Sequence, residues 1–229
     1  KQIPIDMSDY RIQDHTAGLA TYFREYLRMA LTDWCNSHSK SDGTPYNLYR
    51  DGLKIYTTIN SKMQEYAEKA VRDYLAKELQ PLFFRHWKGY ANAPFVFEKS
   101  VEKKEIRNLM MQAMRRTDRY YRLKRQNLTD DAILENFQEP VQMQVFSWNG
   151  PVDTVMSPWD SIRYYKFFLQ AGLMSVDPHT GFVKAYVGGI DNRYFQFDHV
   201  KMSKRQVGST FKPFLYTLAM QEAETPCTK

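Results

Sequence analysis

The sequence predicts an α+β fold in which a helix-rich connector is followed by an antiparallel hairpin and a further helix. Apolar residues recur at helical spacing in residues 16–34 and 61–75, and polar loops separate these stretches. Residues 173–187 contain instead two short β-rich runs with an Asp-Pro turn between them. Helices and paired strands are therefore expected in different parts of the chain.

The first half of the chain is expected to be mainly helical. A helix starts after Thr16, and an alternating, β-rich run at residues 53–59 is typical of a strand. The next helix begins at Ser61, because Ser61 and Gln64 fit a capping box. Pro81 is expected to end or bend that helix, because proline lacks the N–H that an interior turn needs.

The second half starts with an aromatic, irregular stretch at residues 82–100. A long basic helix near 101–126 and a further helix near 130–137 are expected to follow. The next helix begins after Ser157, a suitable N-cap. Beyond the hairpin, a Gly-Gly pair breaks the second strand, and a loop leads to the last helix.

With 229 residues, of which 43% are hydrophobic, the chain is expected to build a packed core rather than remain disordered. No stretch approaches the roughly 18 apolar residues that a membrane helix needs. The chain starts with Lys1 and shows no signal peptide, so we expect it to be a piece of a longer protein. No metal or cofactor is expected, because Cys35 and Cys227 form no Cys-x-x-Cys, the histidines are scattered, and no glycine-rich phosphate loop occurs.

The formal net charge is +6, which favours anionic surroundings such as nucleic acid, phospholipid or an acidic polymer without choosing among them. The predicted basic helix at 101–126 is either a contact surface for such a partner or an ordinary solvated face. Aromatic residues at 83–97 are either a platform for sugars or bases or buried packing. For both features the structural explanation is the commoner one.

The feature with the clearest chemistry is a Ser-x-x-Lys at Ser209 and Lys212. Residues three apart lie on one face of a helix, so the hydroxyl and the amine are close enough to share a proton. This is the minimum arrangement for an acyl-transfer nucleophile with its own base. Two other Ser-x-x-Lys runs, at Ser37 and Ser100, lie in a polar loop and at the edge of a charged helix, and we attribute both to chance.

The residues around this pair support the interpretation. Gly208 removes side-chain bulk where a substrate or an oxyanion would approach the serine. Apolar neighbours would partly remove the Lys212 amine from water, which favours its neutral, basic form. These neighbours are Phe211, Pro213, Phe214, Leu215 and Leu218.

Several segments taken together resemble the class A penicillin-binding proteins, which are bifunctional peptidoglycan synthases. The Arg-Gln-x-Gly-Ser-Thr-Phe-Lys-Pro run at residues 205–213 matches the acylation motif of that family closely. Residues 173–189 are similar to the first hairpin of its transpeptidase domain. Residues 52–59 and 16–24 resemble the segments that lead out of and follow its glycosyltransferase domain, and residues 82–150 look like a variable insertion.

By this resemblance the chain contains the opening of a serine transpeptidase domain of the β-lactamase-like fold, which uses no cofactor. Ser209 would be the acylated nucleophile, attacking the D-Ala-D-Ala bond of a peptidoglycan stem peptide or the ring of a β-lactam. Lys212 would act as the base on that hydroxyl, and Gly208 would line the substrate site. The N–H of Ser209 would supply half of an oxyanion hole.

The resemblance divides the chain into three parts. Residues 1–49 would follow the glycosyltransferase domain, residues 50–165 would be a linker or insertion region, and residues 166–229 would be a truncated N-terminal part of the transpeptidase domain. The Ser-x-Asn and Lys-Thr-Gly motifs of the family do not follow Lys212, and the glutamate-bearing glycosyltransferase motifs are absent. We therefore expect the parent protein to cross-link stem peptides and bind penicillin, and these 229 residues alone to be inactive.

The resemblance also implies a location and partners. The parent would lie at the periplasmic face of the bacterial cytoplasmic membrane, held by an N-terminal helix that this sequence does not contain. Expected partners are peptidoglycan stem peptides, the lipid-linked precursor, β-lactams and cell-wall regulators, but not nucleic acid, for which charge is the sole argument. The alternative function is non-catalytic: residues 50–165 would be a docking module of a cell-wall enzyme that binds a partner protein, an anionic lipid or a glycan.

Overall fold

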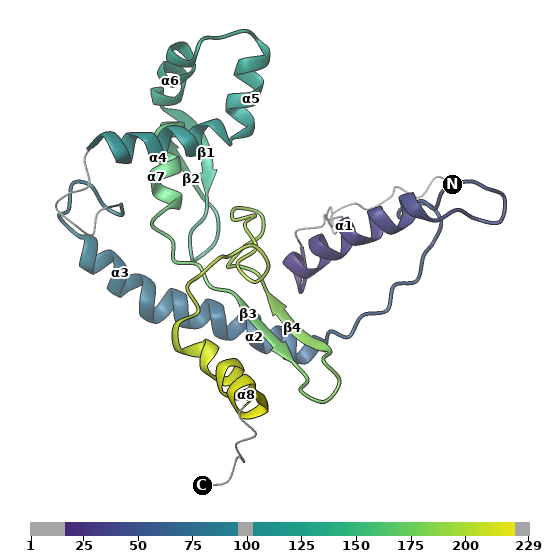
Figure 1. The fold of residues 1–229 in the computed structure, drawn as a ribbon. Helices are drawn as coiled ribbons and strands as arrows, with labels where there is room; N and C mark the ends of the chain where they lie inside the picture. Colours follow the sequence, from purple (N-terminus) through teal and green to yellow (C-terminus); the bar gives the residue numbers. More distant parts are fainter. Residues whose placement is uncertain (1–16, 96–102, 223–229) are drawn as a thin grey trace, which may run out of the picture.

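The structure is a computed structural model that describes residues 17–95 and 103–222 (Figure 1). Its strands form two separate antiparallel two-strand hairpins among helices, which confirms the predicted α+β class. None of the described helices combines the length and the apolar character needed to cross a bilayer. In chain order the elements are α1 (Thr21–Ser37), α2 (Ser61–Tyr74), the π-helical η1 (Leu75–Leu79), α3 (Gln80–Trp87), α4 (Lys103–Arg115), α5 (Asp118–Arg125), α6 (Asp130–Gln138), β1 (Val141–Val145), β2 (Val152–Met156), α7 (Pro158–Tyr165), β3 (Leu173–Val176), β4 (Val183–Val187), the 3-10 helix η2 (Gly208–Phe211) and α8 (Lys212–Glu222).

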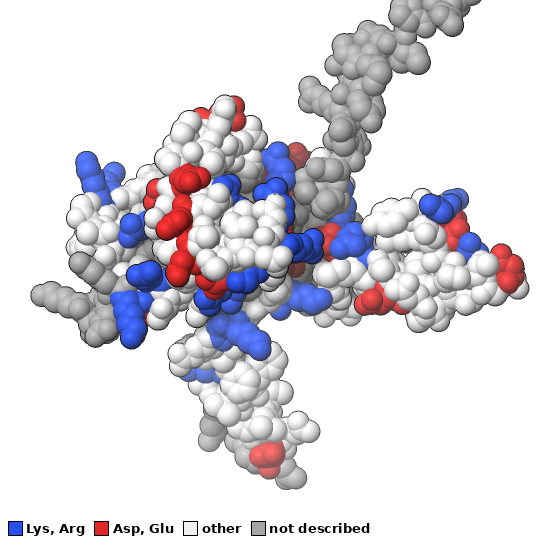
Figure 2. Space-filling view, turned by 90° about the horizontal axis from the view of Figure 1, so that it is seen from above, with Lys and Arg blue, Asp and Glu red and all other residues white. Residues whose placement is uncertain are grey.

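The lobe at the top of Figure 1 consists of α4 to α7 and the β1–β2 hairpin. Met114, Ile133 and Phe137 form its core and are at most 1% exposed. Figure 2, which looks down on this lobe, shows Lys and Arg interspersed with Asp and Glu on its surface. The amphipathic helices thus bury their apolar stripes against one another and leave charges of both signs in water.

The basic helix predicted at 101–126 is in fact two helices, α4 and α5, which are separated at Thr117. Thr117 has an extended backbone, and its hydroxyl accepts a 3.2 Å hydrogen bond from the N–H of Tyr120. A side-chain cap of this kind satisfies a donor in the first turn of a new helix and so favours the break. The break allows α5 to pack on α6, where the Arg119 guanidinium donates to the Asn136 side chain.

Helices α2, η1 and α3 form one long rod that crosses the molecule diagonally in Figure 1. Pro81 does not end this rod, because the preceding turn is π-helical and the N–H of Gln80 donates to the carbonyl of Leu75. Pro81 itself lies in the first turn of α3, where a missing N–H costs little. The stretch predicted to be irregular is therefore helical up to Trp87, whose side chain is buried.

The β3–β4 hairpin confirms the predicted antiparallel pairing, with Leu173 opposite Val187. The Asp177 carboxylate accepts a 2.9 Å hydrogen bond from the N–H of His179 and so stabilises the turn between the strands. Helix α2 packs against β4, where the Gln64 side chain bonds to the main chain of Tyr186. The hairpin is thereby held against the rod.

Two strand predictions need correction. Residues 53–59 are extended but are not a strand, because this stretch meets β4 through the N–H of Asn60, which donates to the carbonyl of Lys184 at 2.9 Å, without forming a ladder. The β1–β2 hairpin, conversely, was not predicted. The alternation of apolar and polar residues at 141–145 is the signal that indicates it.

Two buried glutamines fasten the rod to the rest of the fold. In α2, the Gln64 side chain donates to the carbonyl of Tyr186 at 2.8 Å and accepts from the N–H of the same residue at 2.7 Å. In α3, the Gln80 side chain donates to the carbonyl of Phe167 at 2.8 Å and accepts from the N–H of Leu169 at 2.9 Å. Each amide therefore pairs with the main chain as a neighbouring strand would, and Gln64 protects the edge of β4.

Candidate functional site

The structure places the two predicted catalytic residues at the junction of η2 and α8. Ser209 lies in the 3-10 turn, and Lys212 is the first residue of α8. The N–H of Lys212 donates to the carbonyl of Ser209, which fixes the spacing between the two residues. In a 3-10 helix the side chains of residues three apart are eclipsed, so the hydroxyl and the amine lie on the same face.

The hydroxyl of Ser209 and the amine of Lys212 are not joined by a hydrogen bond within the described residues. Gly208, which precedes the serine, has a φ of +52°. This left-handed backbone conformation is strained for residues other than glycine. A Cβ at this position would meet no atom within 4 Å, so the backbone conformation rather than crowding requires the glycine. The role predicted for Gly208 in substrate binding stays a prediction.

The apolar side chains expected to surround Lys212 do not cover it in the part of the chain that the structure describes. Phe211 is 54% exposed and Phe214 is 69% exposed. Every residue from 204 to 222 is exposed. The dry environment predicted for the amine is therefore wrong, because these neighbours project from η2 and α8 into solvent rather than fold back over the lysine.

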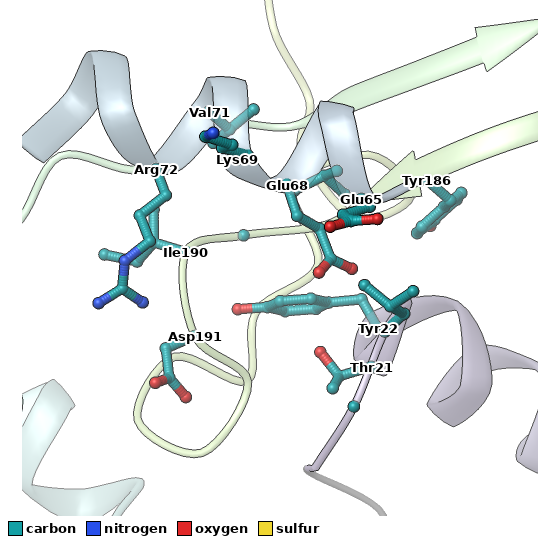
Figure 3. Close-up of a pocket in the computed structure, with 14 residues that line it drawn as sticks. Thr21, Tyr22, Glu65, Glu68, Lys69, Val71, Arg72, Tyr186, Ile190 and Asp191 are labelled. Carbon is teal, nitrogen blue, oxygen red and sulfur yellow. The ribbon is translucent and has the colours of Figure 1, made fainter. Parts of the chain in front are cut away.

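A cavity of about 360 Å³ lies where the start of α1 meets α2 and the end of β4 (Figure 3). It does not include Ser209 or Lys212. In Figure 3 the Tyr22 ring crosses the cavity, with Arg72 and Asp191 near its hydroxyl end. The remaining polar side chains that line the cavity are Thr21, Glu65, Glu68, Lys69 and Tyr186.

The polar groups of this cavity are mostly committed to structural contacts. The Tyr22 hydroxyl donates to the carbonyl of Phe195 at 2.5 Å, and burial, followed by the charge of Asp191, raises the pKa of Tyr22 well above its usual range. Glu68 accepts hydrogen bonds of 2.7 Å from the N–H of Ala20 and from the Gln64 side chain. This cavity is therefore a joint between elements rather than a reaction centre.

Two glycines explain why the joint closes at Tyr22. A Cβ at Gly188 would lie 2.7 Å from the Tyr22 ring, and a Cβ at Gly189 would lie 2.4 Å from its hydroxyl oxygen. The Gly-Gly pair does end the second strand, as predicted, but the reason is that the tyrosine packs directly on its backbone. The sequence alone gives no sign of the role of Tyr22, because its hydrogen-bond partner Phe195 is 173 residues farther along the chain.

The loop from β4 to η2 is anchored by a buried carboxylate. The Tyr186 hydroxyl donates to Asp198 at 2.6 Å, and the other carboxylate oxygen accepts from the N–H groups of Val200 and Lys201 at 2.9 and 3.2 Å. Burial and the nearby Arg205 lower the pKa of the adjacent His199 below its usual value. Asp198 therefore determines where the loop leaves the body toward Ser209.

In the described ranges no group of three or more His, Cys, Asp or Glu side chains is placed to hold a metal ion. What the arrangement can do chemically thus rests on Ser209 and Lys212. A hydroxyl and an amine on one exposed face can carry an acyl group and move its proton.

Comparison with known proteins shows what the chain is similar to. The penicillin-binding protein middle domain matches residues 90–169. Penicillin-binding protein 1A of Escherichia coli (strain K12) is 28% identical to the chain over 207 residues, which cover 77% of this chain and 24% of that protein. The chain is therefore similar to the class A penicillin-binding proteins of the 1A type. The matched residues include α4 to α7 and the β1–β2 hairpin, so the upper lobe is the part of the chain that resembles this middle domain.

Two further relatives match shorter stretches of the chain. Penicillin-binding protein 2D of Bacillus subtilis (strain 168) is 31% identical over 130 residues, or 57% of this chain and 18% of that protein. Penicillin-binding protein 1A of Neisseria cinerea is 47% identical over 60 residues, or 26% of this chain and 8% of that protein. No solved structure gives a significant match. The chain spans at most about a quarter of the length of these relatives.

Proposed function

We propose that this chain forms the connector and the nucleophile-bearing start of a serine D,D-transpeptidase that cross-links peptidoglycan. The observation that carries the proposal is the placement of Ser209 and Lys212 on one face of η2 and α8, with the Lys212 N–H bonded to the Ser209 carbonyl. Similarity to the class A penicillin-binding proteins supports it, because acyl transfer from a serine is the chemistry that this pair can perform.

In the proposed reaction the Lys212 amine takes the proton of the Ser209 hydroxyl. The serine oxygen attacks the carbonyl carbon between the two D-alanines of a stem peptide, an ester forms, and the terminal D-alanine leaves as an amine with the proton. The amine of a second stem peptide then attacks the ester, and the Ser209 hydroxyl is restored. With penicillin, the ring amide bond breaks instead, and the leaving nitrogen remains attached to the acyl group.

The described residues supply one side of this reaction centre. The Ser209 N–H is a candidate oxyanion donor, and Gly208 leaves the approach to the serine free of a side chain. Because residues 204–222 are all exposed, the described chain places no opposing wall against them. Removing one oxyanion donor typically costs about 10²–10³ in rate, so we propose that these residues turn over substrate only within the full-length protein.

Labelling with a fluorescent penicillin tests the proposal in the full-length protein that carries this chain. Ser209→Ala should abolish covalent labelling, and Lys212→Met should slow it roughly 10²–10⁴-fold, because it removes the base. Ser37→Ala, which alters a second Ser-x-x-Lys in the same chain, is the matched control and should leave labelling unchanged. Labelling of Ser209→Ala at the wild-type rate would overturn the proposal.

The setting of the full-length protein is part of the same proposal. It would carry a peptidoglycan glycosyltransferase before residues 1–49, and residues 50–165 and 166–229 would form the linker region and the start of the transpeptidase domain. We place it at the periplasmic face of the bacterial cytoplasmic membrane, with the lipid-linked precursor and stem peptides as substrates and β-lactams as inhibitors. Cell-wall regulators are proposed as its protein partners.

A second candidate function is docking by the upper lobe, and the exposure of Arg116, Arg122 and Arg125 favours it. Not all of the basic side chains remain available for a partner, because Arg115 and Lys124 are bonded to Asp130 at 3.1 and 2.7 Å. Acidic side chains also lie among the basic ones in Figure 2. A partner of this lobe would therefore meet a mixed surface rather than a purely cationic one.

A further inference from the structure

A third glutamine, Gln170, differs from the two that clamp the rod. Gln64 and Gln80 each use both amide atoms to pair with backbone groups. The Nε2 and Oε1 atoms of Gln170 are also buried, yet neither has a hydrogen-bond partner among the described residues. A desolvated primary amide without partners is destabilising, and such groups in native proteins call for an explanation.

Gln170 lies on a cavity of about 460 Å³ that follows α7. Phe168, Phe195 and Phe197 contribute aromatic rings to its wall. Among the described residues that line it, none is Asp or Glu, whereas Lys166 is exposed at it. The cavity thus combines a mainly apolar wall with the charge of Lys166 and a few polar groups, namely the buried amide of Gln170, the half-buried His199 and the exposed Gln196. This is the usual composition of a specific ligand site.

The simplest alternative partner for this amide is a bound water. A buried water needs two to four polar contacts to be held. The hydroxyl oxygen of Tyr165, which also lines the cavity, accepts from the N–H of Phe146 at 3.3 Å, Nδ1 of His199 pairs with the Ser203 hydroxyl at 3.3 Å, and Gln196 is exposed. The surrounding phenylalanine rings offer no further donor or acceptor.

We propose that Gln170 clamps the backbone of an extended peptide segment from a partner protein. In an extended strand the N–H and the C=O of one residue point to the same side, so a single carboxamide can bind both. Gln64 shows this geometry in the same molecule, with both bonds made to Tyr186. The inference does not depend on the role of Ser209.

The same geometry excludes the acetamido group of a sugar as the matching ligand. In a trans amide the N–H and the C=O point in opposite directions, so one acetamido group cannot satisfy both atoms of Gln170. The aromatic wall favours a peptide with large apolar side chains next to the clamped residue. Lys166, unopposed by a carboxylate in the described lining, favours an acidic residue at its flank.

Titration calorimetry of the 229-residue chain with the peptide acetyl-Glu-Phe-Val-Phe-Glu-amide tests the proposal. We expect a dissociation constant on the order of 10–100 µM, as for a short peptide that buries two aromatic rings. Gln170→Leu should weaken binding about tenfold or more, because both clamp bonds are lost. N-methylation of the central valine, which removes its N–H, should have a similar effect.

Matched controls distinguish binding by the Gln170 amide from nonspecific hydrophobic binding. Gln196 lines the same cavity but is exposed, so Gln196→Leu should change the affinity less than about twofold. The all-D form of the peptide should bind at least about tenfold more weakly, because its side chains reach the aromatic wall from the wrong direction. Equal binding of both enantiomers, equal binding by wild type and Gln170→Leu, or no binding at about 1 mM would overturn the proposal.

A thermal unfolding measurement provides an independent test without any peptide. Gln170→Leu should raise the unfolding midpoint of the free chain, because it removes a buried amide that lacks partners. Gln80→Leu should lower the midpoint, because it leaves the Phe167 carbonyl and the Leu169 N–H unpaired. If Gln170→Leu lowers the midpoint as Gln80→Leu does, the amide has a partner within the chain and the proposed site is wrong.

Discussion

Tyr22 packs on a stretch of backbone that has no side chains, and this contact sets the angle between α1 and the β3–β4 hairpin. We predict that Gly189→Ala destabilises the fold by about 2 kcal/mol or more, since overpacking a tight site typically costs 1–3 kcal/mol. The new Cβ would lie 2.4 Å from the Tyr22 hydroxyl oxygen. Urea denaturation of the single variants measures the effect.

A double-mutant cycle tests whether Tyr22 is the cause. Truncation of Tyr22 to Ala removes the atoms that the new methyl group would strike, so Gly189→Ala should cost much less in the Tyr22→Ala background. Purely additive effects would show that the methyl group meets some other obstacle. Because the φ of Gly189 is not positive, backbone strain does not confuse the result.

His199 makes the stability of the fold depend on pH. Burial, and to a lesser extent Arg205, lower the pKa of His199 below the usual 6.5 or so, while Asp198 acts in the opposite direction. The unfolded chain therefore binds a proton at a pH where the folded chain does not. The free energy of unfolding should fall as the pH drops through about 6.5 toward the folded-state pKa of His199.

Urea titrations of wild type and His199→Gln between about pH 8 and pH 5 check this sign. Wild type should lose unfolding free energy relative to His199→Gln as the pH falls. His179, which lies exposed in the β3–β4 turn, provides the control variant His179→Gln. A pH dependence that is the same in all three proteins would show that another group is responsible.

At the scale of single residues, the sequence predicted what local spacing determines and missed what folding brings together. Ser209 and Lys212 are three residues apart, so any helical conformation places them on one face. Tyr22 and Asp198, by contrast, bind partners from other elements, and single-sequence patterns carry no record of such contacts. The exposure of the side chains around Lys212 could not be read from their apolar character either.

At the scale of elements, the predicted boundaries were wrong mostly where a local feature overrides a helical or extended sequence pattern. Thr117 breaks a continuous amphipathic stretch by capping α5, and the π-helical turn before Pro81 lets a helix continue where proline usually stops it. The strand predicted at 53–59 is not formed, because its hydrogen-bonding partner is already occupied. Its alternation is correct, but Gln64 and Asn60 occupy the edge of β4 that a strand would need.

The mixed surface of the upper lobe leads to a prediction about anionic partners. Reversal of Arg116, Arg122 and Arg125 to Glu should abolish any binding to vesicles that contain anionic phospholipid, because each basic residue near such a surface contributes about 1 kcal/mol. These arginines are exposed, so the fold should remain intact. Vesicle sedimentation at about 0.1 M salt measures the effect.

The companion variant Arg115→Glu distinguishes surface binding from damage to the lobe. Arg115 is bonded to Asp130, so its reversal should lower stability by up to about 1 kcal/mol and affect vesicle binding less than the triple reversal. If wild type does not sediment with anionic vesicles, or if the triple variant sediments equally, lipid docking by this lobe is excluded. A protein or glycan partner would then be the remaining form of the docking hypothesis.

At the scale of the whole molecule, the elements that carry the chemistry project from the body. Figure 1 shows α8 extending away from the rod and the β3–β4 hairpin. Its apolar side chains lie in solvent, with Leu218 50% exposed and Phe214 69% exposed. Surfaces of this kind are typical of interfaces with other protein elements. The proposed nucleophile thus lies directly before a helix whose own packing partners are not among the described residues.

This arrangement predicts that the 229-residue chain alone does not retain penicillin, although the full-length protein does. Acylation needs a second oxyanion donor and groups that position the β-lactam carboxylate, and the exposed stretch at 204–222 faces none among the described residues. Intact-mass spectrometry after incubation with benzylpenicillin should show the unmodified chain, while the full-length protein gains one penicillin. A thermal unfolding transition of the chain establishes that it is folded in the assay. A stoichiometric adduct on the chain that disappears in Ser209→Ala would show instead that Ser209 and Lys212 suffice for acylation without a second wall.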